Sequence, residues 1–205
     1  MSDTRQNPRP QFSMPNAQFS ILAAAAAGLC WAGAIALLLF GGVSRADPPL
    51  APPRLLFYLL VLAASLLTFG PVEWGSGLTG LTVEGTLGAG LLLYCLAFVP
   101  APREWLLSLP DLPIYALLLM ALFLCGAALA RPLIHAASLR LFRQRARALD
   151  GRRVRRQSYE VGLLLATIVA LAALRVLTWV SLLLLALALV ITELLFLSQV
   201  EAEAS

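Results

Sequence analysis

Hydrophobic and polar positions along this chain alternate on the scale of whole membrane spans. Four apolar stretches come first, at residues 19–43, 55–72, 78–99 and 112–130. Each is close to the roughly 20 residues that a helix needs to cross the ~30 Å hydrocarbon core of a bilayer. Segments rich in proline and glycine separate them, and neither residue continues a helix easily. The pattern therefore predicts four transmembrane helices before residue 131.

The last apolar region is too long for a single span. Residues 161–200 are almost wholly apolar and contain neither glycine nor proline after Gly162. One helix of that length would measure about 60 Å at ~1.5 Å per residue, about twice the thickness of the hydrocarbon core. A break is expected between Arg175 and Trp179, where a charge, a threonine and an interfacial aromatic residue fall at the midpoint. We expect a hairpin of two spans, 160–175 and 178–198; one bent helix is the alternative.

The predicted fold class is all-α, a polytopic transmembrane helical bundle of six spans. Gly70-Pro71 is expected to end the second span, with Gly75-Ser76-Gly77 as a flexible connector. The predicted regions are a disordered tail at 1–18, a four-span region at 19–130, a basic loop or amphipathic helix at 131–159, a transmembrane hairpin at 160–199 and an acidic tail at 200–205.

Composition makes the membrane assignment firmer. Of the 205 residues, 60% are hydrophobic and only 13% are charged, and the mean hydropathy is +0.85. A soluble domain carries about 45–50% apolar and about 25% charged residues. The apolar excess is too large to be buried inside one globule of this size, so it must face lipid.

The distribution of arginine predicts the orientation. The net charge is +4, and all 15 basic residues are arginine. Nine of them lie between Arg131 and Arg156, together with a single acid, Asp150. Short loops rich in arginine remain on the cytoplasmic side. The sequence therefore predicts a plasma (inner) membrane protein whose basic segment and both termini are cytoplasmic.

The basic segment is also a candidate binding surface. Its apolar residues Leu133, Ala137 and Leu141 recur at helical spacing, which fits either an extension of the fourth span or an amphipathic helix on the membrane surface. Clustered basic residues attract anionic lipid headgroups or an acidic partner, although orientation alone would explain them. Nucleic acid is not an expected partner, because the run lacks interleaved aromatic residues. The candidate contacts are Arg140, Arg143, Arg145, Arg147, Arg152, Arg153, Arg155 and Arg156.

Glu84 is the most informative single residue. It falls inside the third apolar stretch, on one helix face with Gly80 and Gly88. Ionisable groups within a span are costly and usually face a partner, a cavity or a substrate path. Glu84 is therefore a candidate proton or cation site, or one member of a buried pair with Arg175 or Arg131. The alternative is that the helix begins near Thr86 and leaves Glu84 among the headgroups.

Two further ionisable residues and a group of small residues complete the candidates. Arg175 and Glu193 also fall within the last apolar region, where each is either an intramembrane polar group or a boundary residue. Small residues four apart let helix backbones approach closely in lipid. The candidate packing positions in the third span are Gly80, Gly85, Gly88, Ala89 and Gly90.

Signatures of enzymes and metal sites do not appear in the sequence. It contains no HExxH, no phosphate-binding glycine loop and no paired aspartates of a lipid transferase. Cys30, Cys95 and Cys125 lack metal-ligand spacing, so no metal and no cofactor is predicted. The leading hypothesis is a non-enzymatic accessory, scaffolding or assembly subunit that packs with other membrane proteins or with itself, with the arginine-rich loop contacting anionic lipid or an acidic partner. The alternative is a small transporter or channel that uses Glu84. A lipid-modifying enzyme ranks last, because no nucleophile is visible.

Overall fold

The computed structural model describes residues 17–40, 43–44, 48–102, 106, 108–141 and 151–204. The regular elements in these ranges are the helices α1 (Ala17–Leu39), α2 (Pro52–Ser76), α3 (Leu81–Phe98), α4 (Leu112–Leu141), α6 (Gly151–Ala173) and α7 (Trp179–Ala204). Helices α1 to α4 are each long and apolar enough to cross a membrane. The predicted all-α class and the four membrane-length helices are therefore confirmed.

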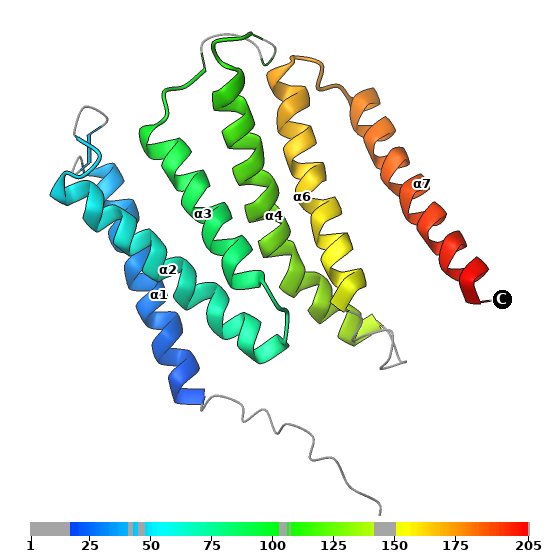
Figure 1. Cartoon of the computed structure of the whole chain (residues 1–205), viewed down its shortest axis with the longest axis horizontal. Helices are drawn as coiled ribbons and strands as arrows, with labels where there is room; N and C mark the ends of the chain where they lie inside the picture. Colours follow the sequence, from blue (N-terminus) through cyan, green and yellow to red (C-terminus); the bar gives the residue numbers. More distant parts are fainter. Residues whose placement is uncertain are drawn as a thin grey trace, which may run out of the picture.

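The helices lie side by side in chain order, with α1 crossing α2 at one edge and α7 at the other (Figure 1). Each helix packs mainly on its neighbours in sequence, and the contacts of α4 with α3 and α6 are the most extensive. Contact between α6 and α7 is slight. The α2–α3 turn, the end of α4 and the start of α6 all lie at the same end of the array (Figure 1).

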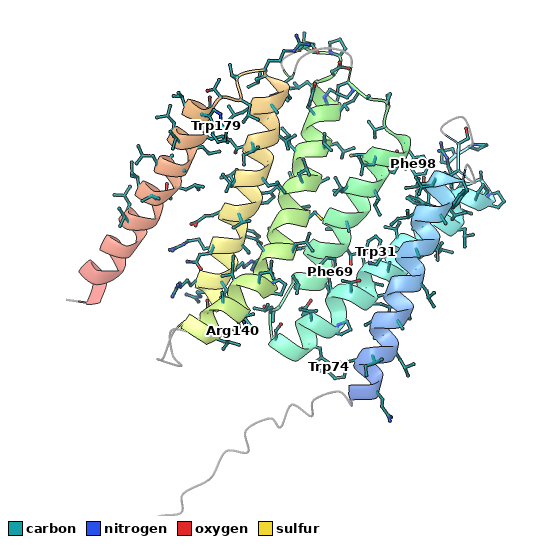
Figure 2. All side chains as sticks on the ribbon, turned by 180° about the vertical axis from the view of Figure 1, so that it is seen from behind. Trp31, Phe69, Trp74, Phe98, Arg140 and Trp179 are labelled. Carbon is teal, nitrogen blue, oxygen red and sulfur yellow. The ribbon has the colours of Figure 1, made fainter. Side chains whose placement is uncertain are left out.

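Trp74 and Trp179 lie toward opposite ends of the helices (Figure 2). Trp74 and Arg140 lie toward one end, whereas Phe98 and Trp179 lie toward the other (Figure 2). Tryptophan favours the interface between headgroups and hydrocarbon, so the two tryptophans fit opposite boundaries of one bilayer. The end with Trp74 and Arg140 is called the basic end below.

Small residues allow the central helices to approach closely. A Cβ atom added at Gly88 of α3 would lie 2.5 Å from the backbone nitrogen of Cys125 in α4. A Cβ added at Gly162 of α6 would meet the carbonyl oxygen of Phe123 at even closer range. Ala127 and Ala128 of α4 are fully buried. In lipid, helices associate through such van der Waals contacts, so α3, α4 and α6 form the tightly packed centre.

At the end opposite the basic end, one arginine holds three segments together. Arg54 of α2 is buried and donates from Nε and Nη2 to the carbonyl oxygen of Ser44, at 3.2 and 2.9 Å. Its guanidinium also lies 4.4 Å from the ring centre of Phe98, at the end of α3. The connection between α1 and α2 is thereby fixed against α3.

The second helix is longer than predicted. The expected end at Gly70-Pro71 and the flexible connector at Gly75-Ser76 are wrong, because α2 continues through Pro71 to Ser76. Proline removes one helical hydrogen bond, a loss that membrane helices tolerate when neighbouring groups compensate. Here the last turn carries Glu73, whose carboxylate accepts the backbone N–H groups of Gly80 and Thr82 at the start of α3. These bonds join the last turn of α2 to the start of α3.

The basic segment is largely helical where it is described. Helix α4 continues through Pro132 to Leu141, so residues 133–141 extend the fourth span, and residues 151–159 form the start of α6. Arg143, Arg145 and Arg147 lie outside the described residues, as do residues 1–16 of the predicted tail. Residues 200–204, predicted as a tail, belong to α7.

The last apolar region is divided close to the expected position. Helix α6 ends at Ala173 and α7 begins at Trp179. Between them Arg175 has a φ of 58°, a left-handed conformation that is uncommon outside glycine and typical of turns. An arginine therefore adopts the turn conformation that glycine usually adopts, so neither glycine nor proline marks this turn in the sequence.

Candidate functional site

The polar cluster of the central helices begins with Glu84 in the first turn of α3. The chain reaches this helix through a tight turn in which Gly77 and Gly80 have φ values of 70° and 85°. Only glycine adopts such values without strain. The carboxylate of Glu73, in the preceding helix, caps the start of α3. Its Oε1 accepts from Gly80 N at 2.8 Å and its Oε2 accepts from Thr82 N at 2.6 Å. The side chain of Glu84 takes no part in these bonds, and its own partners lie on α4 and α6.

Arg131 of α4 is the main partner of Glu84. Its Nη2 donates to Glu84 Oε2, and the two side chains are 2% and 14% exposed. Taking such charges out of water costs several kcal/mol each, a cost that their attraction offsets only with good geometry and further hydrogen bonds. Of the two partners considered from the sequence, the structure brings Arg131 to Glu84. Arg175 lies in the α6–α7 turn, at the opposite end of the array (Figure 1).

Helix α6 supplies the further hydrogen bonds through two residues one turn apart. Tyr159 Oη donates to Glu84 Oε1 at 2.7 Å, and Arg155 Nη2 donates to the same oxygen at 3.2 Å. Arg155 Nε also donates to the Tyr159 hydroxyl at 2.9 Å. Both carboxylate oxygens of Glu84 are therefore satisfied.

The Tyr159 ring is held from three sides. It packs against Phe123 of α4 with ring centres 5.7 Å apart. The guanidinium carbons of Arg131 and Arg155 lie 5.6 and 5.5 Å from its centre, within the range of cation–π attraction. Tyr159 therefore fixes the position of both arginines as well as donating to Glu84. The term Glu84 cluster is used below for Glu84, Arg131, Arg155 and Tyr159.

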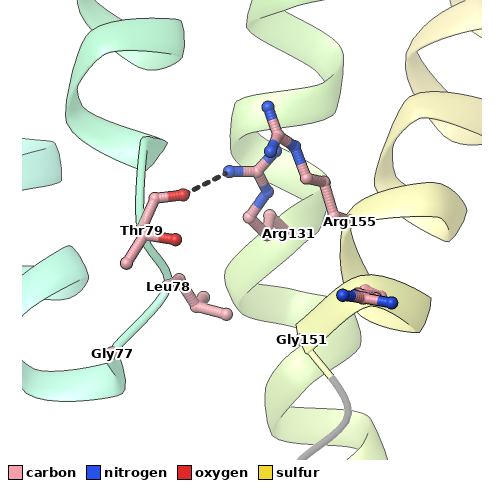
Figure 3. Close-up of a pocket in the computed structure, with 7 residues that line it drawn as sticks. Gly77, Leu78, Thr79, Arg131, Gly151 and Arg155 are labelled. Carbon is pink, nitrogen blue, oxygen red and sulfur yellow. Dashed lines mark hydrogen bonds between the residues drawn. The ribbon is translucent and has the colours of Figure 1, made fainter.

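A cavity of about 400 Å³ adjoins the cluster and is lined in part by Arg131 and Arg155 (Figure 3). Its walls are the α2–α3 turn, the side chain of Arg131 and the start of α6. The lining residues are Gly77, Leu78, Thr79, Arg131, Gly151, Arg152 and Arg155. We call this space the arginine cavity. Its position at the basic end places it next to the boundary of the membrane-length helices.

The other predicted residues are distributed as follows. Gly85 and Ala89 face the neighbouring helices, and a Cβ at Gly85 would lie 2.5 Å from the Phe69 ring of α2. Gly90 has open space where a Cβ would be and lines an apolar groove between α2 and α3. Arg140 is in the last turn of α4, while Arg153 and Arg156 lie near the start of α6. Glu193 belongs to α7, and its side chain lies outside the described residues.

Sequence reasoning missed Tyr159 and Glu73. The spacing of Arg155 and Tyr159 by one helical turn was a usable signal, because residues at i and i+4 lie on the same helix face. Glu73 is separated from its backbone donors, the N–H groups of Gly80 and Thr82, by a turn whose geometry the sequence did not reveal. No group of three or more metal-ligating side chains that could hold an ion occurs in the described part of the chain.

Known proteins offer no assignment for this arrangement. Comparison with protein families, with curated proteins and with solved structures finds no match to the chain. The function is therefore argued from the geometry of the helices and the Glu84 cluster.

Proposed function

We propose that this chain is a non-enzymatic accessory, scaffolding or assembly subunit that associates within the membrane with other transmembrane helices, mainly through α7. The observation that carries the proposal is the slight contact of α7 with the rest of the molecule. Many of its apolar side chains are exposed; among them are Leu183, Leu184, Leu187, Val190, Ile191, Leu194 and Leu195.

The contrast with the central helices supports this role. Helices α3, α4 and α6 are joined by close glycine contacts and by the Glu84 cluster. In α7 the less exposed side chains, such as Leu182, Leu185 and Leu189, recur on one face, and none of the described ones is buried. Because lipid is as apolar as leucine, helices associate in membranes by packing rather than by escape from solvent. The packing surface of α7 is thus available to a helix of another subunit.

Cysteine scanning of α7 tests this proposal. Cys30, Cys95 and Cys125 would first be replaced by alanine, and single cysteines would then be placed at successive positions from 183 to 191. We expect cross-links in native membranes that recur every three to four positions, because a packed helix presents one face to its partner. The products would be identified by mass spectrometry.

The same scan over exposed positions of α1, such as Leu22 and Leu29, provides the control. These positions are expected to cross-link weakly and without periodicity. Uniform or absent cross-linking along α7 would mean that this helix faces lipid alone, and the proposed role would then lose its main support.

The proposal includes six membrane crossings, with both termini and the basic segment in the cytoplasm of a cell bounded by a plasma (inner) membrane. It is supported by the arginines that flank the end of α4 and the start of α6. The apolar part of α6, residues 161–173, measures about 20 Å at ~1.5 Å per residue. Because the hydrocarbon core is ~30 Å thick, a crossing by α6 would also place part of its polar first turns within the core, where they pack against α4.

Reporter fusions test this topology. Fusions after Gly77, Arg153 and Ser205 are expected to be cytoplasmic, whereas a fusion after Thr178 is expected to be external. The physical reason is the cost of moving the arginine-rich segment across the bilayer. An external signal at Ser205 would be incompatible with six crossings, because it would require α6 and α7 to cross the membrane only once together.

The alternative function, a small transporter or channel, receives less support from the geometry. A carrier site must exchange its partners, whereas both oxygens of Glu84 accept hydrogen bonds from side chains on two other helices. This arrangement suits a permanent connection between helices. The alternative would be preferred if Glu84→Gln abolished a proton- or ion-dependent uptake while leaving the amount of folded protein unchanged.

A further inference from the structure

The arginine cavity has the chemistry of an anion-binding site. Three arginines line it, Arg131 of α4 and Arg152 and Arg155 of α6. Its volume is about 400 Å³, within the size range of ordinary ligand sites. Figure 3 shows Arg131 and Arg155 side by side above the start of α6. The site does not involve α7, so it is independent of the proposed function.

Arg131 has more hydrogen-bond donors than close acceptors. A guanidinium carries five N–H donors, and the residue is 1% exposed. Its bond to Glu84 is short, but Nη1 to Thr79 O and Nε to Ser158 Oγ both measure 3.5 Å. Good N–H···O bonds measure about 2.7–3.2 Å. A buried guanidinium with two such long bonds, on the wall of a cavity, favours an acceptor-rich ligand in that cavity.

Helix α6 supplies two of the three arginines. Arg152 and Arg155 both line the cavity, together with Gly151. The Arg155 side chain is 56% exposed, so its guanidinium is accessible to a ligand at the boundary of the helices.

The charged residues that line the cavity are all arginines. Among the described acids, Glu84 is engaged by Arg131, Arg155 and Tyr159, and Glu73 is engaged by the backbone N–H groups of Gly80 and Thr82. The lining of the cavity therefore suits a negatively charged group.

We propose that the arginine cavity binds the phosphate group of an anionic phospholipid from the adjacent leaflet. The position of the cavity favours a lipid, because its wall at Gly77–Thr79 is the turn between two helices of membrane length. Arginine binds phosphate oxygens in a bidentate manner. Basic pockets between helices at a membrane boundary bind lipid headgroups. The volume exceeds that of a phosphate ion and leaves room for further headgroup atoms.

Native mass spectrometry of the purified full-length chain in detergent tests this site. Phosphatidylglycerol would be titrated against phosphatidylcholine with the same acyl chains. We expect tighter binding of phosphatidylglycerol, and about a tenfold loss of its affinity in Arg152→Gln, because one charge-assisted contact to phosphate is removed. Arg155→Gln is expected to have a similar effect. Since Arg155 also belongs to the Glu84 cluster, Arg152→Gln is the deciding variant.

Arg153→Gln is the matched control, because it removes the same charge from the neighbouring position, which does not line the cavity. Its affinity for phosphatidylglycerol is expected to stay within about twofold of the original. An equal loss in Arg152→Gln and Arg153→Gln would overturn the proposal and indicate general surface attraction. Equal binding of phosphatidylcholine would overturn it as well. Competition by inorganic phosphate at concentrations equal to the lipid would assign the cavity to a free anion instead.

Discussion

Replacing Glu84 with alanine is expected to lower the free energy of unfolding by about 3–5 kcal/mol, the range found when one partner of a buried ion pair is removed. Arg131 would remain in place with its side chain 2% exposed and without its carboxylate. Tyr159 and Arg155 would lose the same acceptor, so three side chains on two helices are affected together. This is the largest effect that we expect from any single substitution.

Reversible unfolding in mixed micelles with a rising fraction of denaturing detergent would measure this effect. Glu160→Ala is the control, because Glu160 forms a more exposed ion pair with Arg156 at 3.4 Å, within α6. Loss of this ion pair is expected to lower the free energy of unfolding by less than about 1 kcal/mol. If Glu84→Ala and Glu160→Ala had similar small effects, Glu84 would not connect the three helices.

A double variant separates the cost of an unpaired charge from the value of the pair. Buried ion pairs replaced by apolar residues of similar size are often neutral or even more stable. Glu84→Met combined with Arg131→Met is therefore expected to recover much of the stability lost in Glu84→Ala. Failure to recover would show that the bonds of the carboxylate to Tyr159 and Arg155 matter more than the pair itself.

The second large effect is expected at the glycine contacts of α3 and α4. Gly88→Ala should lower the free energy of unfolding by about 2–3 kcal/mol, because overpacking a tight core typically costs ~1–3 kcal/mol. The new Cβ would lie 2.5 Å from Cys125 N and 2.8 Å from Cys125 Cα, both backbone atoms that cannot rotate away. Helices α3 and α4 would have to separate, which would also move Glu84 relative to Arg131.

Gly90→Ala is the matched control for this prediction. It makes the same chemical change two residues further along α3, at a position with no other atom within 4 Å. It is expected to be neutral or to stabilise the helix by up to about 1 kcal/mol, since alanine favours helix more than glycine does. The same unfolding measurement applies to both variants. Equal effects at the two positions would mean that α3 and α4 do not pack as closely as described.

Only part of the candidate site was accessible from the sequence. Glu84 was identifiable, because an acid inside an apolar stretch needs a partner in lipid. The sequence named Arg131 and Arg175 as alternative ion-pair partners but could not choose between them, and it missed Tyr159, because Arg131 is 47 positions away and Tyr159 is 75. The rotation of α4 and α6 about their axes decides which side chains meet Glu84, and that rotation follows from close contacts such as Gly88 with Cys125.

The sequence by itself determined that this is an all-helical membrane protein, where the first four membrane-length helices lie and where the last apolar region breaks. The bilayer acts as the solvent, so the length and polarity of each segment are sufficient for these features. Only the tertiary structure decided that α2 continues past Pro71, that Glu84 pairs with Arg131 and that α7 stays at the edge. These depend on how the helices are placed against one another, because side chains distant in sequence must supply the compensating contacts.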